Sequence, residues 1–207
     1  MNAVIDWQLF GSVFITLFVI MDPPGTVPIF LGLTAAMTRH QRNRAARQAV
    51  LVALGVIVAF ALFGQKLLEY LHITLPALQA SGGLLLLVVA MELLTGKMEQ
   101  PQPAGDGKVN VALVPLGTPL LAGPGAIVAT MVFVQQTDQT AADWVAIALG
   151  VLAVHVCLYL AMRFANVIHR VLGDGGTILV TRIAGLLLAA IAVQLIANAV
   201  EAFIKAA

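Results

Sequence analysis

The chain consists of long apolar stretches separated by short clusters of charged residues. Six stretches, residues 7–37, 49–68, 75–94, 109–134, 144–162 and 183–203, approach or exceed the length of roughly 17–25 residues that a helix needs to cross a bilayer. The apolar runs are continuous and lack the alternation, over segments of about ten residues, that is typical of a membrane β-barrel. The pattern therefore predicts an all-α integral membrane protein with six transmembrane helices.

Composition supports a membrane location and argues against other classes. Of 207 residues, 60% are hydrophobic and 10% are charged, against about 25% charged residues in soluble domains. The formal net charge of +1 gives no argument for a nucleic-acid partner. Cys157 is alone in an apolar stretch, so no internal disulfide is expected. The first residues lack a positively charged region and a cleavage site, so we expect the first stretch to stay in the mature protein.

The basic residues predict an orientation. Of the 11 Lys and Arg residues, all but Lys66 and Lys205 fall on one side of a six-span arrangement, in the expected loops that join spans one and two, three and four, and five and six. The positive-inside rule places these loops in the cytoplasm and both termini outside. The basic run from Thr38 to Arg47 could also form a lipid-headgroup or nucleic-acid patch, although topogenic charge is the favoured interpretation.

The spans divide into two repeats. Residues 1–95 and 109–207 each contain three spans, and the Pro-, Gly- and Gln-rich segment 96–108 is expected to be a flexible cytoplasmic linker. Because three is an odd number, the second repeat enters the membrane from the opposite face. The first span of each repeat is interrupted by Pro and Gly, at Asp22–Gly32 and Pro115–Gly125. In both, Gly-Thr is followed by Pro, three further residues and Gly.

These interruptions predict helix breaks at the same depth. Proline removes a backbone donor and clashes with the preceding turn, and Asp22 suits the N-cap of a second half-helix with Pro23 in its first turn. Thr118 and Pro119 repeat that arrangement. Asp22 lies roughly 22 Å along the helix from Trp7 at about 1.5 Å per residue, well inside the bilayer. Matched breaks in inverted repeats are typical of a transporter's central site, and simple kinks without a binding role are the alternative.

Several of these segments resemble a known family. The run from Asp22 to Leu31 is similar to the D-P-x-G-x-x-P-x-F signature of the MarC (UPF0056) family, and Val114–Ile127 is similar to its P-L-x-x-P-L-L-x-G-P-G-A-I segment. Ser81–Leu87 and Thr181–Gln194 fit the family too, whereas Glu92 stands where relatives often place Asp-Met. The resemblance implies a bacterial inner-membrane protein, grouped with LysE-type exporters that share a six-span, two-repeat plan. It implies no substrate.

The candidate solute site lies between the two broken helices. Asp22 is the deepest carboxylate, with a purely structural N-cap as the alternative. Glu92 near the end of the third span could act in the site or form an interfacial pair with Lys97. Gln194 and Asn198 share a helical face and could line a polar route or bond a neighbouring helix. The candidate binding residues are Asp22, Pro23, Gly25, Thr26, Pro28, Gly117, Thr118, Pro119, Gly123, Pro124, Gly125, Glu92, Gln194 and Asn198.

Motifs for catalysis are missing, because the sequence has no P-loop Lys, no zinc-binding His/Glu motif and no G-x-S-x-G. We therefore expect no enzyme activity, no cofactor and no metal. The leading hypothesis is a secondary transporter or exporter of a small polar solute across the bacterial cytoplasmic membrane, with the bilayer and the solute as partners. A homo-oligomer is compatible with so small a chain. The alternatives are a channel and a non-transporting assembly factor, which would tolerate Asp22→Asn and Thr118→Ala together.

Overall fold

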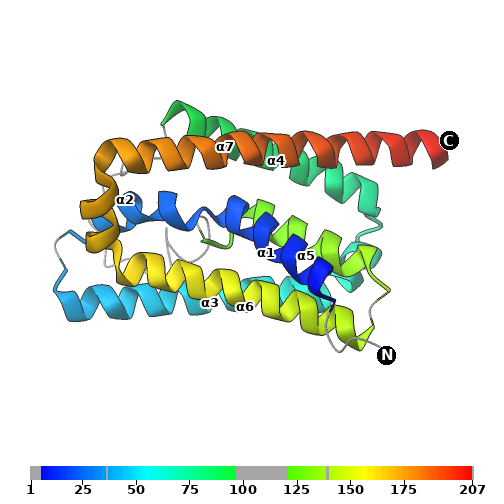
Figure 1. Cartoon of the computed structure of the whole chain (residues 1–207). Coiled ribbons are helices and arrows are strands. Elements are labelled where there is room, and N and C mark those ends of the chain that lie inside the picture. Colours follow the sequence, from blue (N-terminus) through cyan, green and yellow to red (C-terminus); the bar gives the residue numbers. More distant parts are fainter. Residues whose placement is uncertain (1–5, 36, 97–120, 139, 207) are drawn as a thin grey trace.

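The chain folds into a bundle of α-helices (Figure 1). The computed structural model describes residues 6–35, 37–96, 121–138 and 140–206, and the elements within these ranges are helical. They are α1 (Trp7–Met21), α2 (Pro23–Leu33), α3 (Arg39–Tyr70), α4 (Leu75–Thr95), α5 (Pro124–Gln136), α6 (Ala141–Arg163) and α7 (Ala165–Ala206). The prediction of an all-helical protein is confirmed for this part of the chain.

Five helical segments are long and apolar enough to cross a bilayer. They are Trp7–Leu33, Arg39–Tyr70, Leu75–Thr95, Ala141–Arg163 and Gly175–Lys205, and Gly125–Gln136 is a shorter apolar helix. The shorter helix corresponds to the end of the predicted fourth span. The first part of that span, residues 109–120, and residues 97–108 of the predicted linker lie outside the described residues. The six-span count is therefore not decided by these helices.

Two predicted loops are helical instead. The expected loop after the first span is the start of α3, where the hydroxyl of Thr38 accepts the N–H of Gln41 at 3.3 Å and the Gln41 side chain accepts the Thr38 N–H at 2.9 Å. This reciprocal capping box satisfies two donors at the helix end. The expected loop between the last two spans is the start of α7, which is kinked at Gly173 (φ 65°, ψ −178°). Most of the charged residues in both expected loops therefore lie within helices.

Close helix approach depends on small residues. In α4, a Cβ atom at Gly83 would lie 2.8 Å from the backbone oxygen of Ala192 in α7. In α6, a Cβ atom at Gly150 would lie 2.7 Å from the Val13 side chain of α1. Lipid chains are as apolar as leucine, so association in a bilayer depends on such backbone proximity. These contacts hold α4 along α7 and α1 along α6. The α2 helix, which follows the break, contacts both α6 and α7.

Candidate functional site

The first broken span turns at Asp22. The α1 helix ends at Met21 and α2 begins at Pro23, with Asp22 between them in the left-handed conformation (φ 39°, ψ 69°). The Asp22 N–H donates to the Phe18 carbonyl at 3.1 Å, and Oδ1 of Asp22 accepts the Gly25 N–H at 3.1 Å. Proline costs little in the first turn of a helix, where its missing N–H would have no intrahelical partner. The predicted N-cap is confirmed.

The other carboxylate oxygen has no such partner. Asp22 is 6% exposed, and its Oδ2 has no hydrogen-bond partner among the described residues. Oγ1 of Thr181, in α7, is likewise buried and has none. A Cβ atom at Gly25 would clash with Asp22 Oδ2 and would lie 2.9 Å from Thr181 Oγ1. Both oxygens therefore lie close to Gly25, and the Asp22 carboxylate fills the space that a side chain at this position would need.

Such a pair calls for an explanation. A buried polar atom without a hydrogen bond costs about 1–3 kcal/mol, and more where the group is charged. Native structures keep few of these atoms, and those that persist are often found at functional sites. Two such atoms from different helices, beside one glycine, could accept a proton, a cation or a donor group.

A cavity adjoins Asp22 and Gly25, and Thr181 is not among the residues that line it. The cavity has a volume of about 60 Å³ and lies between the α1–α2 break, α4 and the start of α5. A single water needs about 10–15 Å³ measured in this way, so the cavity has room for a few water-sized groups. Asp22 and Thr26 are its polar residues. The remaining lining residues are Ile20, Met21, Gly25, Ile29, Leu86, Val89, Leu93, Leu121, Gly123, Gly125 and Ala126.

The start of α5, in the C-terminal half of the chain, also borders the cavity. Gly123 is the N-cap, Pro124 is the first helical residue, and no side chain caps this end. A helix N-terminus carries a partial positive charge and unsatisfied N–H groups. Both α2 and α5 therefore begin at the cavity, but only α2 is capped by a carboxylate. The arrangement favours an acceptor group near α5 and a donor group near Asp22 Oδ2.

The structure brings together part of the predicted site. Asp22, Gly25, Thr26, Gly123 and Gly125 all line the cavity. Two further predicted residues belong to α2 but do not line the cavity, namely Pro23, which is buried, and Pro28, which is half-buried. Gly117, Thr118 and Pro119 lie outside the described residues, as does the side chain of Pro124.

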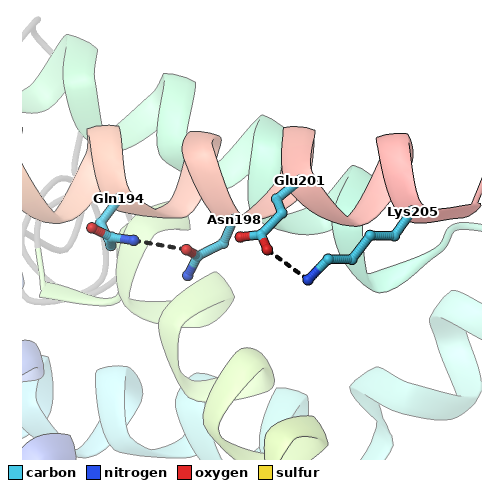
Figure 2. A network of polar contacts seen from close by, with 4 residues as sticks. All are labelled: Gln194, Asn198, Glu201 and Lys205. Carbon is cyan, nitrogen blue, oxygen red and sulfur yellow. Dashed lines mark hydrogen bonds and ion pairs between the residues drawn. The ribbon is translucent and has the colours of Figure 1, made fainter.

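Three further predicted residues, Glu92, Gln194 and Asn198, do not line the cavity either. Glu92 is half-buried in α4, where its neighbour Leu93 faces the cavity instead. The Gln194 side-chain amide donates to Oδ1 of Asn198 at 2.7 Å on α7. Figure 2 shows this pair in one row with the Glu201–Lys205 ion pair, whose atoms are 2.6 Å apart. The polar row is satisfied within its own helix.

Sequence reasoning missed Thr181 as a site residue. Thr177 and Thr181 are four residues apart, so they share one face of α7, and they are 3% and 5% exposed. The Thr177 hydroxyl donates to the Gly173 carbonyl at 2.8 Å, whereas the Thr181 oxygen has no partner among the described residues. The four-residue spacing of the two threonines was the signal in the sequence for a polar face on this helix. It was missed because the residues before 183 were interpreted as a loop.

These observations define a class: a helical integral membrane protein with a broken span that carries a buried carboxylate. The chain belongs to the MarC family, because the family model for "MarC family integral membrane protein" matches residues 7–204. A UPF0056 membrane protein of Methanocaldococcus jannaschii is 34% identical over 201 residues, 95% of this chain and 98% of the relative. The UPF0056 membrane protein YhcE of Escherichia coli is 31% identical over 206 residues, 95% of this chain and 94% of the relative.

A Bacillus subtilis relative, the UPF0056 membrane protein YvbG, is 32% identical over 191 residues, 89% of this chain and 90% of the relative. No solved structure matches the chain significantly. The family resemblance is thus confirmed, while the grouping with LysE-type exporters stays a prediction. The names of the relatives state a membrane location and no activity. The site therefore provides the basis for a functional proposal.

Proposed function

We propose that this protein is a secondary transporter or exporter of a small polar solute across the bacterial cytoplasmic membrane. The observation that carries the proposal is the pair of buried oxygens, Asp22 Oδ2 and Thr181 Oγ1, which lack hydrogen-bond partners among the described residues and flank Gly25. Of these residues, Asp22 and Gly25 line the cavity. Intramembrane carboxylates are costly and usually functional. As part of this proposal the protein is not an enzyme and needs no cofactor.

The chemistry of the site suggests the class of solute. Asp22 Oδ2 would accept a proton, a small cation or the ammonium of a solute. The uncapped start of α5 would receive a carbonyl or carboxylate oxygen. A cavity of about 60 Å³ is too small for most whole metabolites, so a solute would have to enter a more open conformation. We therefore propose alternating access, in which one half of the protein moves against the other.

The packing of the helices supports two inverted repeats. In the proposed plan, α2, α3 and α4 correspond to α5, α6 and α7. The α2 helix packs against α6 and α7, and α5 packs against their counterparts, α3 and α4. The contacts between α3 and α6, and between α4 and α7, then join each helix to its counterpart in the other proposed repeat. We propose that residues 109–120 begin the matching broken span and that both termini are outside.

The direct test is a thermal-shift screen of the purified protein against small metabolites. A solute at 100 times its Kd stabilises the folded state by about 2.7 kcal/mol. We expect the stabilising solute to have no effect on Asp22→Asn. The matched control is Asp6→Asn, because Asp6 is also an N-cap but is exposed and far from the site. If no solute across a broad panel distinguishes Asp22→Asn from wild type, the transporter proposal fails and the assembly-factor alternative gains support.

A further inference from the structure

One end of α3 extends past the bilayer core. Its 32 residues span about 48 Å at 1.5 Å per residue, whereas the hydrocarbon core is about 30 Å thick. The first turns of α3 carry Arg39, Arg42, Arg44 and Arg47. Because these residues are charged, this end of the helix is expected to project into the headgroup region. The C-terminal end of α6, at Arg163, lies at the same end of the bundle (Figure 1).

A basic pocket lies between these ends. It has a volume of about 250 Å³ and is formed by the start of α3, the end of α6 and the start of α7. Its lining includes three arginines, two asparagines and no carboxylate: Arg39, Arg42, Asn43, Arg163 and Asn166, with apolar neighbours that include Phe164. Among the described residues, no ion pair joins any of these arginines to an acidic side chain.

Arg42 is held in place from two sides. Its Nη1 donates to Oδ1 of Asn166 at 3.3 Å, and its Nη2 donates to the Thr34 carbonyl at 3.3 Å. Its Nε is buried and has no partner among the described residues. Arg163 lies 5.7 Å from the centre of the Phe164 ring, a cation–π distance. Three positive groups are thus gathered around one space, with a donor left over.

We propose that this pocket binds the phosphate of an anionic phospholipid headgroup. Guanidinium groups match phosphate oxygens in geometry and charge. Two helices, α3 and α7, also begin at the pocket with the positive ends of their dipoles, against the one negative end of α6. The apolar rim of the pocket favours a lipid over a soluble anion. Phe164 and Val167, 49% and 56% exposed at its rim, offer apolar contacts to the glycerol and the first carbons of the chains.

The test measures lipid binding to the purified full-length protein in neutral detergent by native mass spectrometry. The probes are phosphatidylglycerol and phosphatidylcholine with identical acyl chains. The variant is Arg39→Gln with Arg163→Gln, which leaves Arg42 and its structural hydrogen bonds intact. A charge-assisted hydrogen bond from an arginine to the phosphate contributes about tenfold to the affinity, so the double variant should bind phosphatidylglycerol about 100-fold more weakly.

The matched control is Arg44→Gln with Arg47→Gln. Arg44 and Arg47 are exposed and lie on α3, but they do not line the pocket. Their substitution removes the same amount of charge as the pocket variant does. We expect the control to stay within about twofold of wild type, and wild type to prefer phosphatidylglycerol. Equal losses in the two double variants, or equal binding of both lipids, would overturn the proposal. If water-soluble glycerol 3-phosphate binds as tightly as the lipid, the site takes a soluble phosphate and the lipid assignment is wrong.

Discussion

Asp22 combines a structural role and a proposed chemical role in one side chain, and substitutions can separate them. Oδ1 caps α2 through the Gly25 N–H, whereas Oδ2 has no partner among the described residues. Asparagine keeps an oxygen acceptor and removes the charge. Glycine removes the side chain but accepts the left-handed backbone of this position, and alanine loses both the cap and the ease of that conformation.

The structure sets the order of stabilities. Loss of an N-cap to alanine costs about 1 kcal/mol, whereas replacement by glycine costs a few tenths. A left-handed conformation adds about 1 kcal/mol or more for alanine. Asp22→Ala should therefore be destabilised by about 2 kcal/mol, which corresponds to a Tm lower by about 4–8 °C for a chain of this size. Asp22→Gly should fall between Asp22→Ala and wild type, and Asp22→Asn should melt close to wild type.

Solute binding should follow a different order. If the carboxylate at Asp22 binds the solute, all three variants lose the solute-dependent rise in Tm, including the one that melts like wild type. The assay is a melting curve of each purified variant with and without the solute that stabilises wild type. Full retention of the rise in Asp22→Asn would show that the residue is only a cap. Equal melting temperatures for the alanine and asparagine variants would refute the reasoning about the backbone.

Three further predictions follow from the packing and the orientation. Gly83→Ala should lower the stability by about 1–3 kcal/mol, because its Cβ would lie 2.8 Å from a backbone oxygen of α7. Gly55→Ala, in open space, should be neutral or stabilising by up to about 1 kcal/mol, and equal melting of the two variants contradicts the packing argument. Gly25→Ala should displace the Asp22 carboxylate and abolish the solute-dependent Tm rise, which an unchanged rise would disprove. Alkaline phosphatase should be active when fused to the C-terminus and inactive within 96–108, and the reverse result would invert the predicted orientation.

The broken span could be predicted because its causes are local. Two prolines, a glycine and Asp22 determine where one helix ends and the next begins, and the structure has the break and the cap at these residues. The start of α3 was equally available, since Thr38 and Gln41 have the spacing of a capping box. It was missed because the charge nearby was interpreted as a loop.

The position of Thr181 near Asp22 could not be predicted in the same way. Thr181 reaches Gly25 only because α7 passes α2, and this contact depends on the packing of helices far apart in the sequence. Gln194 and Asn198, in contrast, were predicted to be in the site but do not line the cavity. Their spacing places them on one face of a helix, but which face meets the cavity depends on the rotation of α7, and there the two side chains bond each other.

The central claim is that the cavity at the α1–α2 break opens in turn to both sides of the membrane. Its most direct test needs no known solute. Thr26 lines the cavity and is 3% exposed, and Cys157 is the one cysteine of the chain. In a Cys157→Ser background, Thr26→Cys would be treated with a membrane-impermeant thiol reagent in right-side-out and in inside-out vesicles. Ile57→Cys, in the core and 0% exposed, is the control. Alternating access predicts labelling of Thr26→Cys in both vesicle types and none of the control, whereas labelling from one side only, or from neither, would contradict it.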